Sequence, residues 1–368
     1  MAATATRAEA AVERLDVHAC TIPTDEPESD GTAQWDSTTI VIVEAHAAGE
    51  TGIGYTYSEP AAAELVRSKL DGVVRDRDVD DVRAAWLALT AAVRNAGRPG
   101  IAFCAVSAVD QALWDLKARR CGLPLVVLLG AAHEDVPIYG SGGFCSYSDD
   151  RLREQLGGWV AAGIPRVKMK LGREPQRDPE RLDAARAAIG DDTELFVDAN
   201  GAFTAKRALA WAERYALGWN VSWFEEPVSS ADLAGLRLVR EQGPPGLEIA
   251  AGEYAYVPAD FRNLVGCVDV LQADVTRCGG ITGLLSASGL ANAHGIDVSA
   301  HCAPAISAHA FCAVERRRHL EYFHDHVRIE QMLFDGVPEP DGGVLRPDRS
   351  RPGNGLELKR REIERWSA

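Results

Sequence analysis

The chain has 368 residues and a formal charge of −15 at neutral pH. This length suits a large barrel together with a second domain, and the negative charge argues against a nucleic-acid surface or an anionic membrane surface. None of the eight cysteines forms a Cys-x-x-Cys pair, and no apolar run has membrane length. We therefore expect a cytoplasmic protein with reduced thiols and with neither nucleic acid nor membrane as a partner.

The first third of the chain, residues 1–130, predicts an α+β domain. Two strands and two helices are expected there, at residues 38–47, 51–57, 83–93 and 102–120. The acidic stretch near residues 24–37 is too hydrophilic to pack, so we interpret it as a candidate lid. An ordinary solvated loop is the alternative.

Residues 131–326 alternate between short apolar runs and stretches of helical spacing. Eight strands are expected, at residues 136–139, 166–170, 194–198, 221–225, 248–253, 268–274, 296–301 and 320–323. This alternation is typical of βα units, so the sequence predicts an α/β fold with a (β/α)8-type barrel. The tail, residues 327–368, is not barrel-like. We expect it to return to the first domain and complete an α+β capping domain.

Polar residues gather at the C-terminal ends of the predicted strands, where barrels of this type place their chemistry. They are Lys168, Lys170, Asp198, Asn200, Glu225, Glu253, Asp274, His301 and Glu321. Alternation along residues 166–170 sends both lysines to one face of the strand. Since lysines are rarely buried without a partner, anions are expected opposite them.

Asp198, Glu225 and Glu253 end three successive strands and supply only carboxylate oxygens. Such a hard-oxygen set suits Mg²⁺, or Mn²⁺, rather than zinc. Alternation allows one of Glu225 and Glu226 to face the barrel interior. We assign Glu225 as the ligand and Glu226 as a partner behind it, an assignment that a bulge would invert.

Two bases are expected on opposite sides of this metal site. Lys170, near Lys168 and a divalent cation, should have a lowered pKa and act as a base near neutrality, while Lys168 binds a substrate carboxylate. Asp274 is expected to orient His301 and raise its basicity. Glu321 is either a protonated donor to a developing oxyanion or a salt-bridge partner.

A divalent cation with a base on each side is suited to removing a proton α to a carboxylate, because the enediolate carries more charge than the ground state. Tyr55, Tyr57 and Ser141 are expected near the pocket mouth and suit a hydroxylated substrate, whereas Trp35 would suit an aromatic one. Cys302 follows His301 on a strand, so it should point away and serve packing.

At these residues the chain resembles the enolase superfamily, specifically its mandelate racemase subgroup. The motifs are Val167-Lys168-Met169-Lys170, Val197-Asp198-Ala199-Asn200, Trp223-Phe224-Glu225-Glu226-Pro227, Gly252-Glu253, Gln272-Ala273-Asp274, Gly279-Gly280-Ile281-Thr282-Gly283, His301 and Leu320-Glu321. The resemblance covers nearly the whole chain. It implies a small carboxylate substrate, Mg²⁺ on the three carboxylates and a homo-oligomeric assembly.

The resemblance also implies Lys170 as the base on one face and the His301–Asp274 pair on the other. Within the subgroup, two such bases serve either β-elimination of water from acid sugars or racemisation. We expect a sugar acid dehydratase, with a racemase or epimerase as the second candidate. A non-catalytic protein that binds a carboxylate is the candidate from another class.

Overall fold

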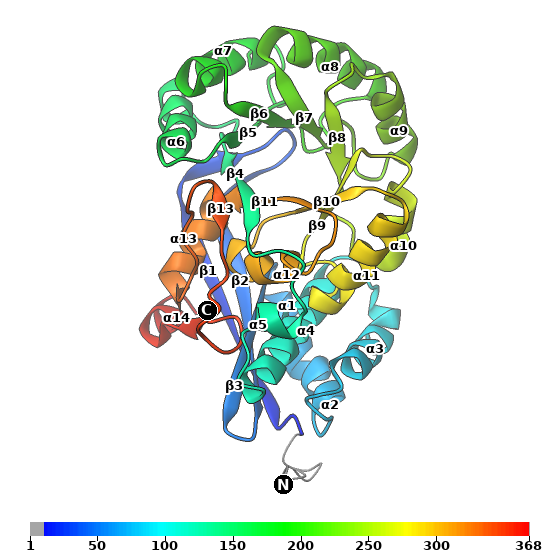
Figure 1. Cartoon of the computed structure of the whole chain (residues 1–368), viewed down its shortest axis with the longest axis vertical. Helices are drawn as coiled ribbons and strands as arrows, with labels where there is room; N and C mark the ends of the chain where they lie inside the picture. The colour runs from blue at the N-terminus through cyan, green and yellow to red at the C-terminus, as the bar shows by residue number, and fades with distance from the viewer. Residues whose placement is uncertain (1–10, 368) are drawn as a thin grey trace.

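The computed structural model describes residues 11–367 and shows a closed barrel beside a smaller capping domain (Figure 1). Eight parallel strands form the barrel, in sequence order around the ring, and the pairing of the last with the first closes it. They are β4 (Val136–Gly142), β5 (Arg166–Lys170), β6 (Glu194–Asp198), β7 (Val221–Glu225), β8 (Glu248–Ala251), β9 (Val270–Ala273), β10 (Asp297–Ala300) and β11 (Arg317–Phe323). The predicted (β/α)8-type barrel is confirmed.

Helices surround the barrel and cover the outward face of its strands (Figure 1). They are α6 (Asp149–Ala161), α7 (Asp178–Ile189), α8 (Ala205–Trp219), α9 (Leu233–Gln242), α10 (Pro258–Leu264), α11 (Gly280–Ala293), α12 (Pro304–Phe311) and α13 (His324–Leu333). Outward-facing Val167 and Met169 of β5 are fully buried in the main apolar core. A second cluster, including Tyr139, Phe196 and Trp223, fills the barrel interior. Phe196 and Trp223 precede the terminal acids of their strands by two residues, so this cluster forms the floor of the site.

The capping domain begins with an antiparallel three-stranded sheet, β1 (Arg14–Ser29), β2 (Gln34–Ala47) and β3 (Glu50–Tyr57). Its helical elements are α1 (Ala61–Leu65), η2 (Val66–Leu70), α2 (Asp71–Val74), α3 (Val82–Ala92), η3 (Arg94–Ala96), α4 (Ile101–Arg120) and α5 (Leu125–Leu128). The sequence analysis did not predict β1, because the polar half of this strand lacks apolar alternation. None of the helices in residues 11–367 combines the length and apolar character needed to cross a membrane.

The C-terminal tail contacts both parts of the molecule. It contains β12 (Phe334–Asp335), β13 (Val344–Leu345), β14 (Glu357–Leu358) and α14 (Arg360–Trp366). Arg360 forms an ion pair with Glu44 of the capping sheet, whereas β13 pairs with barrel strand β4. The predicted boundary at residue 326 falls inside α13, and the domain limits remain a proposal.

Part of the acidic stretch near residues 24–37 packs, contrary to our expectation: Glu28, Ser29 and Asp30 are buried, whereas most of the other residues are exposed. It forms the tip of the β1–β2 hairpin, which reaches from the capping domain to the barrel (Figure 1). Glu28 is fully buried and accepts a hydrogen bond from Trp35 Nε1 at 2.8 Å. Asp30 accepts bonds from the backbone of the tip, and Thr32 Oγ1 donates to the backbone oxygen of Asn200 at 3.2 Å. Local hydrogen bonds thus replace part of the solvent that these polar groups lose, whereas Glu28 Oε1 is buried without a partner.

Glu28 should make the stability of the protein depend on pH. Burial, followed by the charge of Asp325, raises its pKa to about 8 from an ordinary value of 4.5. The folded chain therefore retains a proton that the unfolded chain releases, and stability should fall as pH rises from about 4.5 to about 8. We expect the melting temperature of Glu28→Gln to fall less than that of the wild type as pH rises through this range. Melting temperatures that fall equally with pH in both proteins would contradict the prediction. Glu26→Gln, at an exposed position, is the control.

Strand β3 lies so close to α4 that only glycine fits at Gly54. A Cβ there would meet Ala108 O at 2.2 Å and Ala112 N at 2.5 Å. We expect Gly54→Ala to lower the free energy of unfolding by about 1–3 kcal/mol. Gly72→Ala, where a Cβ meets nothing within 4 Å, should be neutral or slightly stabilising. Thermal unfolding of both variants tests this, and equal melting temperatures would refute the close-packing argument.

Candidate active site

The two lysines of β5 face carboxylates, as the alternation predicted. Lys168 Nζ donates to Glu225 Oε1 at 2.7 Å and lies 3.4 Å from Asp198 Oδ2. Lys170 Nζ donates to Asp198 Oδ2 at 2.5 Å. These four side chains are buried almost completely. They come together because β5, β6 and β7 are parallel neighbours in register, with Lys170 paired to Asp198 and Asp198 paired to Glu225.

The other side of the barrel end holds Glu253, Asp274 and His301. His301 Nδ1 lies 2.8 Å from Asp274 Oδ2, and His301 Nε2 lies 2.8 Å from Glu253 Oε2. Asp274 also accepts hydrogen bonds from the backbone and hydroxyl of Thr276. Burial disfavours the His301 cation, but Cys302, Glu253 and Glu321 outweigh it and hold the pKa of His301 well above its ordinary value. The structure therefore forms the predicted Asp274–His301 pair.

Glu321 joins the two halves of the site as an ion-pair partner. Its Oε1 accepts hydrogen bonds from Lys168 Nζ at 2.8 Å and from Ser141 Oγ at 2.6 Å. Burial raises the pKa of Glu321, but the charge of Lys168 opposes it and holds the pKa well below its ordinary value. Of the two interpretations of Glu321, the structure favours the salt bridge over the protonated donor.

The protein's own charges hold the pKa of Lys170 above its ordinary value. Burial lowers this pKa, but the charge of Asp198 opposes burial, and the carboxylates of Glu321 and Glu225 add to it and outweigh the charge of Lys168. The lowered pKa expected from the sequence depends on a divalent cation beside Lys170 as well as on Lys168, and it stays a prediction.

The oxygen set of the site fits a hard divalent cation. Asp198, Glu225 and Glu253 offer buried carboxylates, and Asn200 Oδ1 and Glu226 Oε1 are buried without a hydrogen-bond partner. Burial and the charge of Asp198 raise the pKa of Glu225 to about 7, so a cation beside it would favour its ionised form. Oxygen-only donor sets of this kind suit Mg²⁺ or Mn²⁺.

A cavity of about 580 Å³ opens onto Asn200 and Glu253 of this oxygen set. Lys170, Asn200, Glu253, His301 and Glu321 line it, together with Trp35 and Asp30 of the hairpin tip. The cavity lies between the barrel strand ends and the capping domain, which is why residues from both form its wall.

Tyr55 does not line this cavity, contrary to our expectation. It is fully buried, and its hydroxyl donates to Glu330 Oε1 at 2.5 Å. Tyr57 lines the cavity instead and stacks on His326 at 3.4 Å between ring centroids. Two residues along a strand shift a side chain by about 6–7 Å, which places Tyr55 in the core. Ser141 is also absent from the wall, because it lies behind Glu321.

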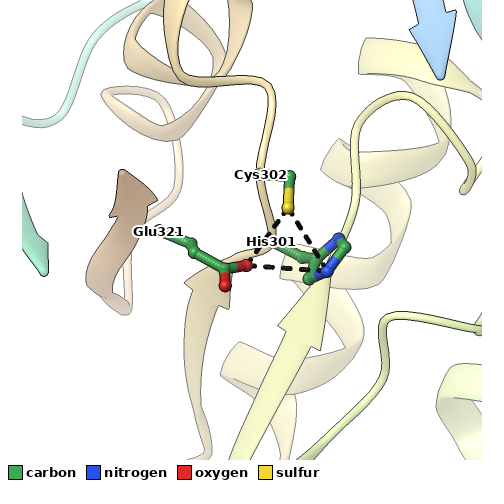
Figure 2. A group of neighbouring side chains, drawn as sticks. All are labelled: His301, Cys302 and Glu321. Atoms are coloured by element: carbon green, nitrogen blue, oxygen red, sulfur yellow. Dashed lines mark hydrogen bonds and ion pairs between the residues drawn. The ribbon is translucent and has the colours of Figure 1, made fainter. Parts of the chain in front are cut away.

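The sequence analysis gave no role in the site to three residues that the structure places near it. Arg277 lines the cavity with Nε 3.4 Å from Asp274 Oδ2, and His326 lines it too. Cys302 was expected to point away from His301, but its Sγ lies 3.4 Å from His301 Nε2 (Figure 2). Strand β10 ends at Ala300 and Cys302 has a φ of 52°, so strand alternation no longer applies to it.

The barrel, the capping domain and the carboxylate cluster together define an enolase-type architecture. Two family models match the chain: "Mandelate racemase / muconate lactonizing enzyme, N-terminal domain" over residues 18–130 and "Enolase C-terminal domain-like" over residues 151–363. The chain belongs to the mandelate racemase/muconate lactonizing enzyme family of the enolase superfamily. The resemblance drawn from the sequence is thereby confirmed.

Curated relatives with named activities include a cycloisomerase and a dehydratase. The chain is 33% identical to 3,6-anhydro-alpha-L-galactonate cycloisomerase of Streptomyces coelicolor, covering 94% of this chain and 96% of that protein. It is 31% identical to L-talarate/galactarate dehydratase of Salmonella typhimurium, covering 87% and 80%. Its relatives thus include enzymes that act on acid sugars.

Solved structures agree with this assignment. A mandelate racemase/muconate lactonizing enzyme-like protein from Rubrobacter xylanophilus has 61% identity and a TM-score of 0.96, covering 97% of this chain and 100% of that chain. A racemase from Streptomyces coelicolor with bound magnesium has 30% identity and a TM-score of 0.91, with coverage of 97% and 100%.

Proposed function

We propose that this chain is a Mg²⁺-dependent acid sugar dehydratase that removes the α proton of its substrate and eliminates the β-hydroxyl as water. The observation that carries the proposal is the pair of proton-transfer groups, Lys170 and the His301–Asp274 pair, that reach one cavity from different strands. Mg²⁺ held by Asp198, Glu225 and Glu253 would polarise the substrate carboxylate and stabilise the enediolate.

The side chains then have separate tasks. Lys168, held by Glu225 and Glu321, adds positive charge where the substrate carboxylate becomes an enediolate. Lys170, once deprotonated, takes the α proton. His301 donates a proton to the β-hydroxyl as the C–O bond breaks, so that water leaves and the resulting enol becomes a 2-keto-3-deoxy acid. Asp274 keeps the proton on Nδ1 and thereby directs Nε2 to the substrate.

The wall of the cavity supports a hydroxylated substrate. Besides the charged groups, its lining includes the polar side chains of Thr21, Ser37, Thr38, Thr39 and Ser58. Hydroxyl groups both donate and accept hydrogen bonds, which matches the several hydroxyls of an acid sugar. The lining also includes four aromatic side chains, Trp35, Tyr57, Tyr254 and Phe323, and the two tyrosines add hydroxyl groups. A small polyhydroxy carboxylate therefore matches the hydroxyl groups of this wall.

Racemisation or epimerisation is the second candidate, because two bases at one carbon also exchange its proton between faces. The Streptomyces coelicolor neighbour that is called a racemase favours keeping it. Incubation with Mg²⁺ and a panel of mono- and diacid sugars, read for 2-keto-3-deoxy product, tests dehydration. Proton NMR in D2O is the parallel measurement. Deuterium at the α-carbon without keto product would overturn dehydration in favour of racemisation.

The same panel tests the non-catalytic alternative. A carboxylate-binding protein would bind panel members, as seen by thermal shift or calorimetry, without turnover or α-proton exchange. Binding that persists in Lys170→Met with no activity in the wild type would support that alternative.

A homo-oligomeric assembly and a cytoplasmic location belong to the proposal. The location is supported by the cysteines, all eight of which are free thiols. Light scattering after size exclusion tests the assembly, and a monomer would contradict it.

A further inference from the structure

We propose that His301, Cys302 and Glu321 form a second metal site, selective for a thiophilic divalent cation such as Zn²⁺, at the wall of the cavity. The three side chains converge on one point and differ in donor type (Figure 2). A nitrogen, sulfur and oxygen set is softer than the all-carboxylate set of Asp198, Glu225 and Glu253. The two sets should therefore prefer different ions.

The spacing of the donor atoms matches zinc. His301 Nε2 and Cys302 Sγ are 3.4 Å apart, Cys302 Sγ and Glu321 Oε2 are 3.3 Å apart, and His301 Nε2 and Glu321 Oε2 are 3.5 Å apart. Zinc bonds of about 2.0–2.3 Å at tetrahedral angles separate donor atoms by roughly 3.3–3.6 Å. The three separations therefore match those between three ligands of a tetrahedral zinc ion.

The second polar atom of His301 and of Glu321 is held by partners outside the proposed site. His301 Nδ1 bonds Asp274 at 2.8 Å, the carboxylate–histidine arrangement that orients metal-binding histidines. Glu321 Oε1 contacts Lys168 Nζ and accepts a hydrogen bond from Ser141 Oγ, whereas Glu321 Oε2 contacts Cys302 Sγ. A bound ion would replace the contact between His301 Nε2 and Glu253.

The backbone holds Cys302 in an uncommon conformation that brings its sulfur to the site. Cys302 and Ala303 have φ values of 52° and 47°, in a region that costs a non-glycine residue about 1–3 kcal/mol. Ser307 Oγ, within α12, donates to the backbone oxygen of Cys302 at 2.9 Å. Cys302 lies just before that helix. All three ligands also line the cavity, so an ion can enter from it.

Metal binding here would block the proposed reaction. The metal–sulfur bond forms as the S–H bond of Cys302 breaks, the metal–nitrogen bond forms as the Nε2–H bond of the His301 cation breaks, and both protons go to solvent. The ion thereby holds the Nε2 lone pair that proton transfer requires. We therefore expect reversible inhibition by Zn²⁺ that a chelator removes. The inhibition rests on the proposed function, whereas the binding does not.

Cobalt titration of the full-length protein in excess Mg²⁺ tests the site without reference to activity. Co²⁺ bound by a thiolate gives a charge-transfer band in the near ultraviolet, whereas Co²⁺ on carboxylates does not. We expect one Co²⁺ per chain with this band, displaced by Zn²⁺. In Cys302→Ser the affinity should fall at least about 100-fold, since loss of an outer partner alone costs roughly 10–100-fold.

Cys121→Ser is the matched control, because Cys121 is an exposed free thiol and its loss should leave the band intact. Absence of the band in the wild type, or its survival in Cys302→Ser, would overturn the proposal. In assays normalised to each variant's own rate, Zn²⁺ should inhibit the wild type more strongly than Cys302→Ser. Equal inhibition would refute the regulatory part. The expected band in a protein that turns over no acid sugar would instead refute the proposed function and leave the metal site standing.

Discussion

Lys170→Met should lower both dehydration and α-proton exchange by about 10²–10⁴-fold, the usual contribution of a positioned acid or base. Methionine preserves most of the length and packing of the side chain but has no proton-accepting nitrogen. The measurements are kcat for keto-acid formation and the rate of deuterium incorporation in D2O. Near-wild-type exchange in Lys170→Met would show that another group removes the α proton.

His301→Asn separates the two proton-transfer steps. If Lys170 removes the α proton and His301 protonates the leaving hydroxyl, His301→Asn should lose product formation while retaining exchange. The reverse pattern in the two variants would exchange their roles. Lys206→Met, at an exposed position early in α8, controls for loss of a lysine as such. Circular dichroism of all three variants establishes that each is folded.

Removal of the divalent cation should abolish activity, and added Mg²⁺ should restore it. A cation that stabilises the enediolate contributes several kcal/mol, which corresponds to a rate loss of roughly 10³-fold or more. The experiment is treatment with a chelator, gel filtration and assay with increasing Mg²⁺. Activity that persists in the chelated protein would contradict the metal assignment.

Glu225→Gln and Glu226→Gln decide which neighbouring glutamate is the ligand. We expect Glu225→Gln to raise the Mg²⁺ concentration needed for half-maximal activity much more than Glu226→Gln does. The stabilisation of folding by Mg²⁺, seen as a shift in melting temperature, gives a readout independent of turnover. The opposite ranking would mean that the left-handed turn at Glu226, where φ is 36°, brings that carboxylate to the metal.

The order of strands and the inward acids were predictable from local pattern. A parallel strand buried on both faces contains a short apolar run, and a two-residue period decides which side chains face inward. These regularities act within five or six residues. They sufficed to locate all eight barrel strands and to predict that Lys168 and Lys170 meet Asp198 and Glu225, because neighbouring parallel strands end at one edge of the sheet.

The hairpin tip shows where local pattern failed. Its acidic sequence suggested a solvated segment, yet Glu28 is buried, and Trp35 on the paired strand donates a hydrogen bond to its Oε2. Tyr55 similarly resembled a pocket residue but bonds to Glu330 of α13. Both outcomes depend on partners that a window of sequence around the residue does not contain.

The sequence by itself determined the barrel, the inward direction of Lys168 and Lys170 and the hard-oxygen character of the acids, because these follow from residue type and strand period. Tertiary structure alone decided the charge environment. Lys170 has a raised pKa because Asp198 outweighs burial, and Glu321 forms an ion pair because Lys168 lies beside it. Coulomb energies depend on distances between distant parts of the chain. Cys302 reaches His301 for a related reason: the chain turns after β10, and that turn is held by contacts outside the strand.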